Sequence, residues 1–376
     1  MNILWILDKE FDVALNVSAR LATIEYLEKR HDLTVVTSFR KDKKEFGRIR
    51  SRIIYLRAAR IPAVKLISLY FRQLRLVRRD LDLGRYDVVL VNSSNYLLLR
   101  RLAHMRANGK PKLILDIRTL PTESNRLKKG LNRFLMRKSL EAAAREFDGI
   151  TYITETMRKY CEERFRLPRH RAAVWGTGVD LDLFPPRPFA SEVGKTLKLM
   201  YHGKAAENRA IGNVVRALSR LTDIDVEFLV LGQERELRGL KKLVSELGQE
   251  DRVNFMDYLP HDRVPDQIAR ADAGILPFPD LDQWNTSSAI KLFEYLASGR
   301  PVIITKLPAH LEVLDGREFA FWSETSSPKD LAAAIRAAAS RKPDFSRLGR
   351  DARSFVESRF GWETQLGHLE EFMRSL

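Results

Sequence analysis

The stretch NTSSAIKLFEYLASGRPVI, residues 285–303, predicts a loop, a helix, a sharp stop and a strand. Residues 289–298 contain no proline and permit a helix, while Gly299 suits the left-handed position after a helix end and Pro301 prevents continuation. Residues 302–304 then form a short apolar strand. The four residues before the helix all favour its N-cap position: Asn285, Thr286, Ser287 and Ser288.

The predicted helix has two stripes of side chains at helical spacing. The apolar stripe should face a core, and its members are Ile290, Phe293 and Ala297, with Leu292 and Leu296 beside them. The polar stripe is Ser287, Lys291, Glu294 and Ser298. Because a helix N-terminus attracts phosphate, this stretch suits a sugar nucleotide, with phosphates at the cap and ribose hydroxyls at Glu294. The alternative is a capped amphipathic helix with a solvated Lys291–Glu294 pair.

Length and composition indicate a two-domain α/β protein. The chain has 376 residues, of which 44% are hydrophobic, so two packed cores are expected. Cys161 is the sole cysteine, which excludes a disulfide framework and suits a reducing, cytoplasmic compartment. The opening MNILWILDKEFDV lacks a basic leader and predicts a strand, and no apolar run reaches the length of a membrane-spanning helix.

The positive charge is concentrated in the first half of the chain. Residues 1–186 contain 38 Lys+Arg and 21 Asp+Glu, whereas residues 187–376 contain 27 and 28. The first half therefore favours an anionic partner, which could be acidic lipid, nucleic acid or a phosphorylated substrate. Residues 61–81 form a basic amphipathic helix that suits an anionic membrane surface, and 123–146 predict a second basic helix. Alternatively, the apolar face of 61–81 packs on the sheet.

Strands and helices alternate along both halves. Strands are predicted at 2–7, 33–38, 53–56, 86–94, 112–121, 149–154 and within 172–180, then at 197–203, 226–232, 252–260, 273–279, 302–304 and 318–323. Helices connect most of them, and 363–376 form a closing helix. This alternation predicts two open parallel sheets, whose ligands bind outside the carboxyl ends of the strands.

A second polar cluster follows the strand at 197–203. Gly203 ends that strand, Lys204 follows it, and Arg209 begins the next helix. Two cations beside a glycine that permits close approach suit a diphosphate, although two ordinary surface cations would look the same. His170 and His202 lie near candidate loops but are isolated in the sequence, so no metal site is predicted.

Several enzyme classes are disfavoured by missing motifs. No glycine lies between residues 1 and 46, so the G-x-G-x-x-G fingerprint of an N-terminal NAD or FAD site is absent. G-x-S-x-G, H-E-x-x-H and G-x-x-x-x-G-K-[ST] are absent too, which disfavours a serine hydrolase, a zincin or a Walker ATPase.

Taken together, these segments resemble the GT-B-fold retaining glycosyltransferases of family 4, also called glycosyl transferases group 1. Residues 150–186 resemble the segment that ends the family's N-terminal domain, and YHGK…NR at 201–209 is similar to its diphosphate-binding pair. VEFLVLG, NFMDYLP, ADAGILPF and SSAIKLFEYLASGRPVI follow in the family's order. The resemblance implies an α/β GT-B fold: two Rossmann-like domains whose parallel sheets face a central cleft.

The resemblance also implies domain functions and boundaries. Residues 1–186 would bind the acceptor, 190–359 would bind a nucleotide sugar, and the terminal helix 360–376 would pack back on the first domain. The implied reaction transfers a hexose from a UDP- or GDP-linked donor to a lipid-linked or polysaccharide-precursor acceptor, with retention of configuration and without metal or cofactor. The expected location is the cytoplasm, including peripheral attachment to the inner face of the membrane.

Individual residues receive functions from the same resemblance. Lys204 and Arg209 would stabilise the leaving diphosphate, and Asp116 and Arg118 would face the cleft as further catalytic residues or anchor their loop. The implied donor-binding residues are Gly203, Lys204, Arg209, Tyr258, Leu259, Asn285, Thr286, Ser287, Ser288, Lys291 and Glu294. The sequence departs from the family pattern at Thr286, where an acidic residue is usual, and at Thr119, where an aspartate is usual. DKEFDVALNVSAR replaces the usual glycine-rich loop after the first strand.

Two other functions stay open at the level of sequence. A GT-B-fold sugar-nucleotide epimerase would turn over the donor without an acceptor, and it would need acid and base side chains that the sequence does not clearly supply. A non-enzymatic basic protein that binds nucleic acid or membrane would explain the charge of the first half but not the motifs of the second. We therefore expect a nucleotide-sugar donor and no nucleic-acid partner.

Overall fold

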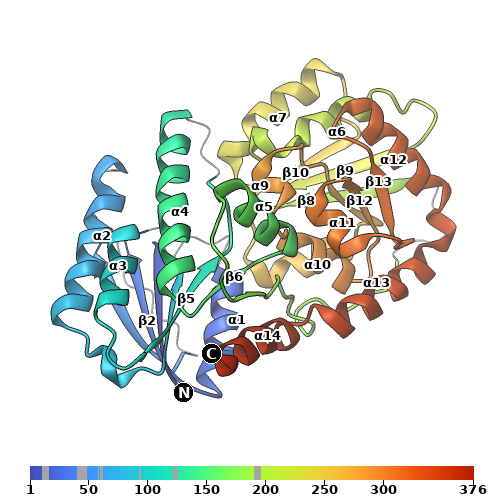
Figure 1. The fold of residues 1–376 in the computed structure, drawn as a ribbon. Coiled ribbons are helices and arrows are strands. Elements are labelled where there is room, and N and C mark those ends of the chain that lie inside the picture. The colour runs from blue at the N-terminus through green and yellow to red at the C-terminus, as the bar shows by residue number, and fades with distance from the viewer. Residues whose placement is uncertain are drawn as a thin grey trace. The chain divides into compact units, whose positions relative to one another are not determined.

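The computed structural model describes residues 1–10, 17–39, 49–57, 59, 62–92, 95–121, 126–189 and 196–376. Two compact units divide the chain: unit 1 comprises Met1–Gly176 with Gln365–Leu376, and unit 2 comprises Thr177–Thr364. The first unit therefore ends before residue 186, because Val179 and Phe184 are buried in the core of unit 2. Both units are built from a parallel sheet with helices around it (Figure 1).

Unit 1 contains a seven-stranded parallel sheet in the order β3-β2-β1-β4-β5-β6-β7. Its strands are β1 (Asn2–Glu10), β2 (Asp32–Phe39), β3 (Arg52–Arg57), β4 (Val88–Asn92), β5 (Lys112–Ile117), β6 (Gly149–Tyr152) and β7 (Ala172–Val174). Its helices are α1 (Val17–Glu28), α2 (Pro62–Arg79), α3 (Tyr96–His104), α4 (Arg126–Glu146), α5 (Glu155–Phe165) and most of α14 (Trp362–Ser375). The central strands are continuous apolar runs because helices cover both faces of such a sheet.

The last helix, α14, joins unit 1 from Gln365 onwards. Phe372 packs so closely on Gly149 that a Cβ there would lie 2.4 Å from its ring. The Tyr26 hydroxyl donates to Glu370 over 2.9 Å, and His31 lies 3.1 Å from the same carboxylate. The C-terminal residues are thus part of the packing of unit 1.

Unit 2 contains a six-stranded parallel sheet in the order β10-β9-β8-β11-β12-β13. Its strands are β8 (Leu197–His202), β9 (Val226–Leu231), β10 (Val253–Met256), β11 (Ala273–Leu276), β12 (Val302–Thr305) and β13 (Ala320–Ser323). Its helices are α6 (Ile211–Leu218), α7 (Glu234–Glu246), α8 (Val264–Ile268), α9 (Asp282–Asn285), α10 (Ile290–Ala297), α11 (Pro308–Leu314), α12 (Pro328–Ser340) and α13 (Phe345–Arg359).

The two sheets share one topology. In each unit the first strand of the chain pairs in parallel with the second and the fourth: β1 with β2 and β4, and β8 with β9 and β11. The chain order therefore reverses direction beside β1 and beside β8. In doubly wound sheets ligands bind at the carboxyl ends of the strands at such a reversal, so the expected position of a site in unit 2 is beside the ends of β8 and β11.

Candidate functional site

Unit 2 brings the two predicted clusters together at this reversal. Gly203 follows β8 with φ +94°, a conformation that favours glycine, and its carbonyl oxygen would lie 3.1 Å from a Cβ at Gly232. The loop 277–289 follows β11, the neighbour of β8. The backbone at 203 therefore needs a glycine, while the predicted close approach of a diphosphate there stays a prediction.

The N-terminus of α10 differs from the predicted cap. Its N-cap residue is Ala289, whose side chain makes no capping hydrogen bond. The hydroxyl of Thr286 is buried and donates to the Asp282 carbonyl over 2.8 Å, and the Ser288 carbonyl accepts from Thr177. Thr286 is therefore used at the end of the short helix α9, and the N-cap residue of α10 offers no side-chain acceptor to the first N–H groups. Gly299 has φ +69° after the helix, as predicted.

Glu294 is the centre of a cluster with His202 and His261, which we call the Glu294 cluster. His261 Nε2 lies 2.7 Å from Glu294 Oε1, and His202 Nε2 lies 3.2 Å from Oε2. Glu294 is 1% exposed, and the His261 side chain is 37% exposed, so His261 forms the outer side of the cluster. A group entering from solvent would meet the carboxylate beside His261.

Burial and the mutual interactions of the three side chains shift the pKa values of the Glu294 cluster. Burial alone would raise the pKa of Glu294, but the histidines outweigh it and lower this pKa to about 2. Burial lowers the pKa of His202. Burial acts in the same direction at His261, but Glu294, together with Asp180 and Asp262, outweighs it and raises the pKa of His261. Of the two histidines, His261 is therefore the one whose protonated form is favoured beside Glu294.

Lys291 is buried, so the alternative of a solvated Lys291–Glu294 pair is wrong. Only 6% of the residue is exposed, its ammonium donates to the His202 carbonyl, and Nζ lies 3.9 Å from the centre of the Tyr201 ring. Burial lowers the pKa of Lys291 well below its usual value, and the Arg209 guanidinium adds to this effect. Helix α10 is packed on all sides because the core of unit 2 surrounds it, which its two stripes did not indicate.

Lys204 and Arg209 lie on either side of a short loop after β8. Lys204 is exposed, whereas Arg209 is half-buried with its guanidinium 4.7 Å from the Trp284 ring centre and 5.4 Å from that of Phe278. Among the described residues, Arg209 Nε has no hydrogen-bond partner. Stacking fixes this cation while part of its donor capacity stays available for an anion.

Tyr258 and Leu259 follow β10 and precede His261 in the chain. Tyr258 is exposed, and Leu259 is half-buried against the core of unit 2. Asn285 donates to the Asp280 carboxylate, and Ser287 is half-buried. The predicted donor-binding residues therefore come from the segments that follow β8, β10 and β11 and from helix α10.

Asp116 and Arg118 belong to unit 1, at the end of β5. Asp116 is buried and accepts hydrogen bonds from Thr151 at 2.8 Å and from the Trp175 indole at 3.0 Å. Burial raises its pKa, while Arg118 opposes that shift. Arg118 donates to the Trp175 and Gly176 carbonyls and stacks 3.7 Å from the Trp175 ring centre. These contacts show loop anchoring for both side chains, and their catalytic function stays a prediction.

His202 and His261 are the site residues that the sequence did not reveal. His202 was expected to be isolated, but it lies against Glu294 because β8 and α10 are neighbours in unit 2. Its position directly before Gly203 was the available signal. His261 had no comparable signal, because its contact with Glu294 depends on how the turn after β10 folds.

Both units match family models of glycosyltransferases. The model of Glycosyltransferase Family 4 matches residues 21–183, and that of Glycosyl transferases group 1 matches residues 187–355. The chain belongs to the family 4 type of glycosyltransferases.

Known proteins with similar sequences or structures support this assignment. Spore coat protein SA of Bacillus subtilis is 25% identical over 233 residues, which are 56% of this chain and 60% of that protein. The chain thus spans less than two thirds of the length of the curated relatives that it matches. Sucrose-phosphate synthase from Thermosynechococcus elongatus has a TM-score of 0.82 at 16% identity, covering 100% of this chain and 99% of that one. A structure of Anabaena Alr3699/HepE in complex with UDP has a TM-score of 0.77 at 15% identity, covering 100% of both chains.

The described residues contain neither a cluster of metal-binding side chains nor a helix suited to crossing a membrane. No group of three or more His, Cys, Asp or Glu within the described ranges is arranged to hold a metal ion. Within the same ranges, no helix combines the length and apolarity needed to cross a membrane.

Proposed function

We propose that the chain transfers a sugar from a nucleoside diphosphate sugar bound by unit 2. The observation that carries this proposal is the set of groups at the ends of β8 and β11: Lys204, Arg209, the uncapped start of α10 and the Glu294 cluster. Cations and the N-terminal N–H groups of α10 suit a diphosphate, and the ionised carboxylate of Glu294, reached beside His261, suits two adjacent ribose hydroxyls. Negative charge on the leaving diphosphate would be stabilised by these fixed donors.

The same geometry suggests where the other parts of the donor lie. Tyr258 and Leu259 precede His261, so we assign them to the nucleotide base beside the ribose. The loop from Asp282 to Ser288 would contact the donor sugar, mainly through its backbone, because the Thr286 hydroxyl is already bonded to Asp282. Lys291 would act from inside the site, through the carbonyl of His202 and its own charge.

We propose UDP as the first nucleotide to test, with GDP as the second. One solved structure of Alr3699/HepE contains UDP, and another contains UDP-glucose. For the acceptor we propose a lipid-linked or polysaccharide-precursor molecule bound by unit 1, with retention of configuration and no metal requirement. Asp116 and Arg118 would then position the acceptor-binding loop rather than exchange protons.

A thermal-shift panel of UDP, GDP and ADP tests the nucleotide part of the proposal. One nucleotide should raise the melting temperature, because a ligand that binds only the folded state stabilises it. Glu294→Ala and Lys204→Ala should lose most of that shift, whereas Lys242→Ala, on an exposed lysine of α7, should keep it. The proposal fails if no nucleoside diphosphate changes the melting temperature.

Product analysis tests the transfer part. The reaction would use a sugar donor of the nucleotide that raises the melting temperature, with a lipid-linked acceptor. NMR should show that the glycoside keeps the anomeric configuration of the donor. EDTA should not slow the formation of the glycoside. Conversion of the donor to an epimer in the absence of acceptor would instead establish the epimerase alternative.

A further inference from the structure

Exposed apolar side chains are gathered on three adjacent helices of unit 1. Among the described residues, nine large hydrophobic side chains are exposed, and seven of them belong to α2, α3 and α4. These seven are Val64, Ile67, Phe71, Leu97, Leu127, Leu131 and Phe134. α3 contacts both α2 and α4, so the three helices lie side by side (Figure 1). We call these seven side chains the helix surface.

The exposed residues form regular stripes rather than a scatter. Val64, Ile67 and Phe71 are three and four residues apart, so they lie on one side of α2. Leu127, Leu131 and Phe134 have the same kind of spacing on α4. Phe71 is 64% exposed and Leu127 is 85% exposed. Scattered single hydrophobics on a surface are ordinary, but such a grouping indicates a contact surface.

The opposite side of α2 packs in the usual way. Leu69 and Val77 are buried at 1% and 0% exposure, and Val77 belongs to the core of unit 1. The sequence left open whether the apolar face of this helix meets the sheet or a membrane. The structure shows that α2 has two apolar sides, and only one of them is covered by unit 1.

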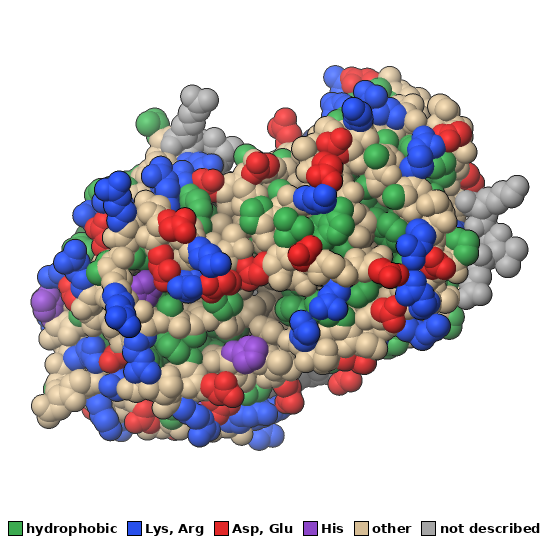
Figure 2. Space-filling view, turned by 45° about the vertical axis from the view of Figure 1, so that its right-hand side comes forward, with side chains coloured by type: hydrophobic (Ala, Val, Ile, Leu, Met, Phe, Trp, Pro, Cys, Tyr) green, Lys and Arg blue, Asp and Glu red, His purple; other side chains and the backbone are tan. Residues whose placement is uncertain are grey.

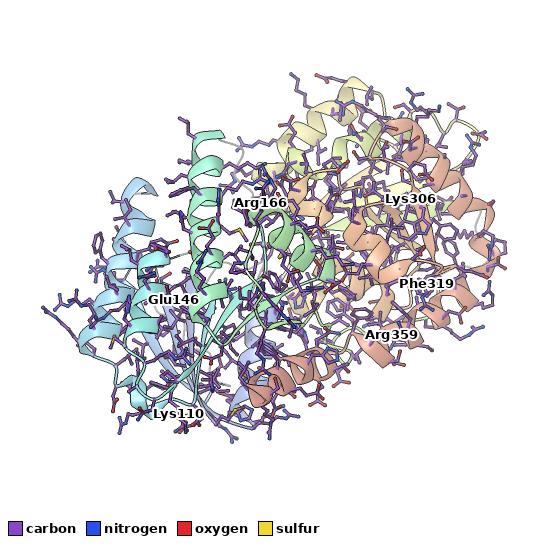
Figure 3. The ribbon with its side chains drawn as sticks, viewed as in Figure 1. Lys110, Glu146, Arg166, Lys306, Phe319 and Arg359 are labelled. Atoms are coloured by element: carbon purple, nitrogen blue, oxygen red, sulfur yellow. The ribbon has the colours of Figure 1, made fainter. Side chains whose placement is uncertain are left out.

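Most of the helix surface lies towards one edge of the sheet. A helix between parallel strands starts at the carboxyl end of one strand and returns to the amino end of the next, so 64–67, 97 and 127–131 lie nearer the carboxyl edge, and Phe71 and Phe134 lie near the middle of their helices. Figure 3 shows Glu146, at the other end of α4, on the same side as Lys110, which precedes β5. The helix surface is therefore at the edge where doubly wound sheets bind ligands.

Cations continue and flank the apolar stripes. Helix α2 has five Lys+Arg and no Asp or Glu, and α4 has seven Lys+Arg and two Glu. Arg75 and Arg78 extend the stripe of Phe71 and are exposed, and Lys138 Nζ lies 6.0 Å from the Phe134 ring centre. Over the whole face drawn in Figure 2, acidic side chains are interspersed with the Lys and Arg side chains.

We propose that this helix surface docks unit 1 on an anionic lipid bilayer. Apolar side chains would enter the boundary between headgroups and acyl chains, and the flanking cations would contact anionic headgroups. A nucleic acid would use the cations and could stack on Phe71 and Phe134, but it would leave the aliphatic side chains in water. Five of the seven residues are aliphatic, which favours lipid. A bilayer at this edge would present a lipid-linked acceptor beside the strand ends of unit 1.

The sole cysteine makes this proposal directly testable. Cys161 is buried at 0% exposure, so a cysteine introduced at the surface can be labelled selectively with an environment-sensitive NBD dye. Phe71→Cys and Phe134→Cys place the dye on the helix surface, and Lys242→Cys places it on α7 of unit 2 as a control. With vesicles containing phosphatidylglycerol, the dye at 71 and 134 should brighten and shift to the blue, and the dye at 242 should not.

Vesicle co-sedimentation of unlabelled variants provides the second measurement. Arg75→Glu and Arg78→Glu should each weaken binding to anionic vesicles by at least about fivefold, and Lys242→Glu should not. Phe71→Ser with Phe134→Ser should reduce binding by about tenfold or more, since each buried apolar group adds to interfacial affinity. These sites are exposed, so circular dichroism should show unchanged folding.

Three outcomes would overturn the proposal. The first is an equal dye response at 71, 134 and 242. The second is that the protein binds duplex DNA but not vesicles, and that the same variants weaken the DNA binding. The third is that the protein forms a dimer that Phe71→Ser dissociates. None of the assays requires sugar transfer, so the proposal can fail while the proposed function stands, and the reverse also holds.

Discussion

The outer bond of the Glu294 cluster gives the sharpest prediction, through the substitution His261→Ala. The pKa of Glu294 falls from its ordinary 4.5 to about 2. One pKa unit corresponds to about 1.4 kcal/mol, so after the opposing effect of burial the site still favours the ionised carboxylate by about 3 kcal/mol, and the two histidines supply that preference. His261 is more than a third exposed, and solvent screens its share, so we assign it about 1 kcal/mol.

At pH 6, without ligand, His261→Ala should therefore lower the melting temperature of unit 2 by about 3 °C. In the wild type, ribose hydroxyls would have to displace His261 from the Glu294 carboxylate before they could bind there. In the variant the bond between His261 and Glu294 is absent, so it does not have to be broken. UDP, or whichever nucleotide the panel selects, should bind the variant as tightly as the wild type or up to about fivefold more tightly. The nucleotide-induced rise in melting temperature should consequently be larger in the variant.

Differential scanning fluorimetry and isothermal titration calorimetry measure both effects on one sample. His368→Ala, on an exposed histidine of α14, is the matched control and should change neither quantity. Glu294→Gln should lower the melting temperature and also weaken nucleotide binding, because it removes the carboxylate itself. If His261→Ala weakens binding tenfold, the histidine contacts the nucleotide directly and the reasoning is refuted.

Four further predictions follow from contacts in the two units. Because Glu294 raises the pKa of His261 above its ordinary 6.5, their mutual stabilisation is complete below pH 6.5 and lost as pH rises through the raised value. The melting difference between wild type and His261→Ala should shrink between pH 6 and 9, and a constant difference would contradict this. Lys204→Ala should weaken nucleotide binding about tenfold by calorimetry, since charged hydrogen bonds contribute about 1.5 kcal/mol or more. An equal loss of affinity in Lys242→Ala would show that the effect is not specific to Lys204. Asp116→Ala removes the acceptor of two buried donors and should cost unit 1 about 3 kcal/mol by scanning calorimetry, leaving nucleotide affinity unchanged. Gly274→Ala would place a Cβ 2.2 Å from the Tyr295 ring and should cost about 2 kcal/mol or more, so an unchanged melting temperature would show that Tyr295 can move.

The positions of the strands could be predicted from the sequence because buried parallel strands are short apolar runs between helices. The predicted strands all exist, with ends displaced by a few residues at most. The helices α9, α11 and α13 were not predicted. Helix α9 has only four residues, so periodicity cannot reveal it. Helix α13 has apolar residues at helical spacing, at Phe345, Leu348, Ala352 and Phe355, and could have been found.

The candidate site was only partly predictable, for a physical reason. Local signals gave Gly203 and Gly299, because a positive φ favours glycine wherever it occurs. The environment of Glu294 depends on three segments far apart in the chain, and their contacts arise only when β8, η4 (His261–Arg263) and α10 pack together. The burial of Lys291 could not be predicted for the same reason. A stripe of polar residues on a helix indicates a solvated face, and only the packing of the other segments of unit 2 shows that this face is covered.

The buried charges of α10 argue for a ligand rather than for stability. Moving an ammonium and a carboxylate out of water costs several kcal/mol each, and apolar residues of similar volume at such positions are often equally stable or more so. Glu294 offsets only part of this cost for Lys291, because the hydrogen bond of the ammonium goes to the His202 carbonyl and the pKa of Lys291 stays lowered by burial. A bound diphosphate would reverse that penalty by placing negative charge near Lys291 and Arg209. Asp116 in unit 1 presents a different case, since its carboxylate accepts from the Thr151 hydroxyl and the buried Trp175 indole, whereas Glu294 lies beside the partly exposed His261. We therefore expect different functions for the two buried acids: Asp116 would hold its loop in place, and Glu294 would belong to a site whose charges are balanced when the proposed donor is bound.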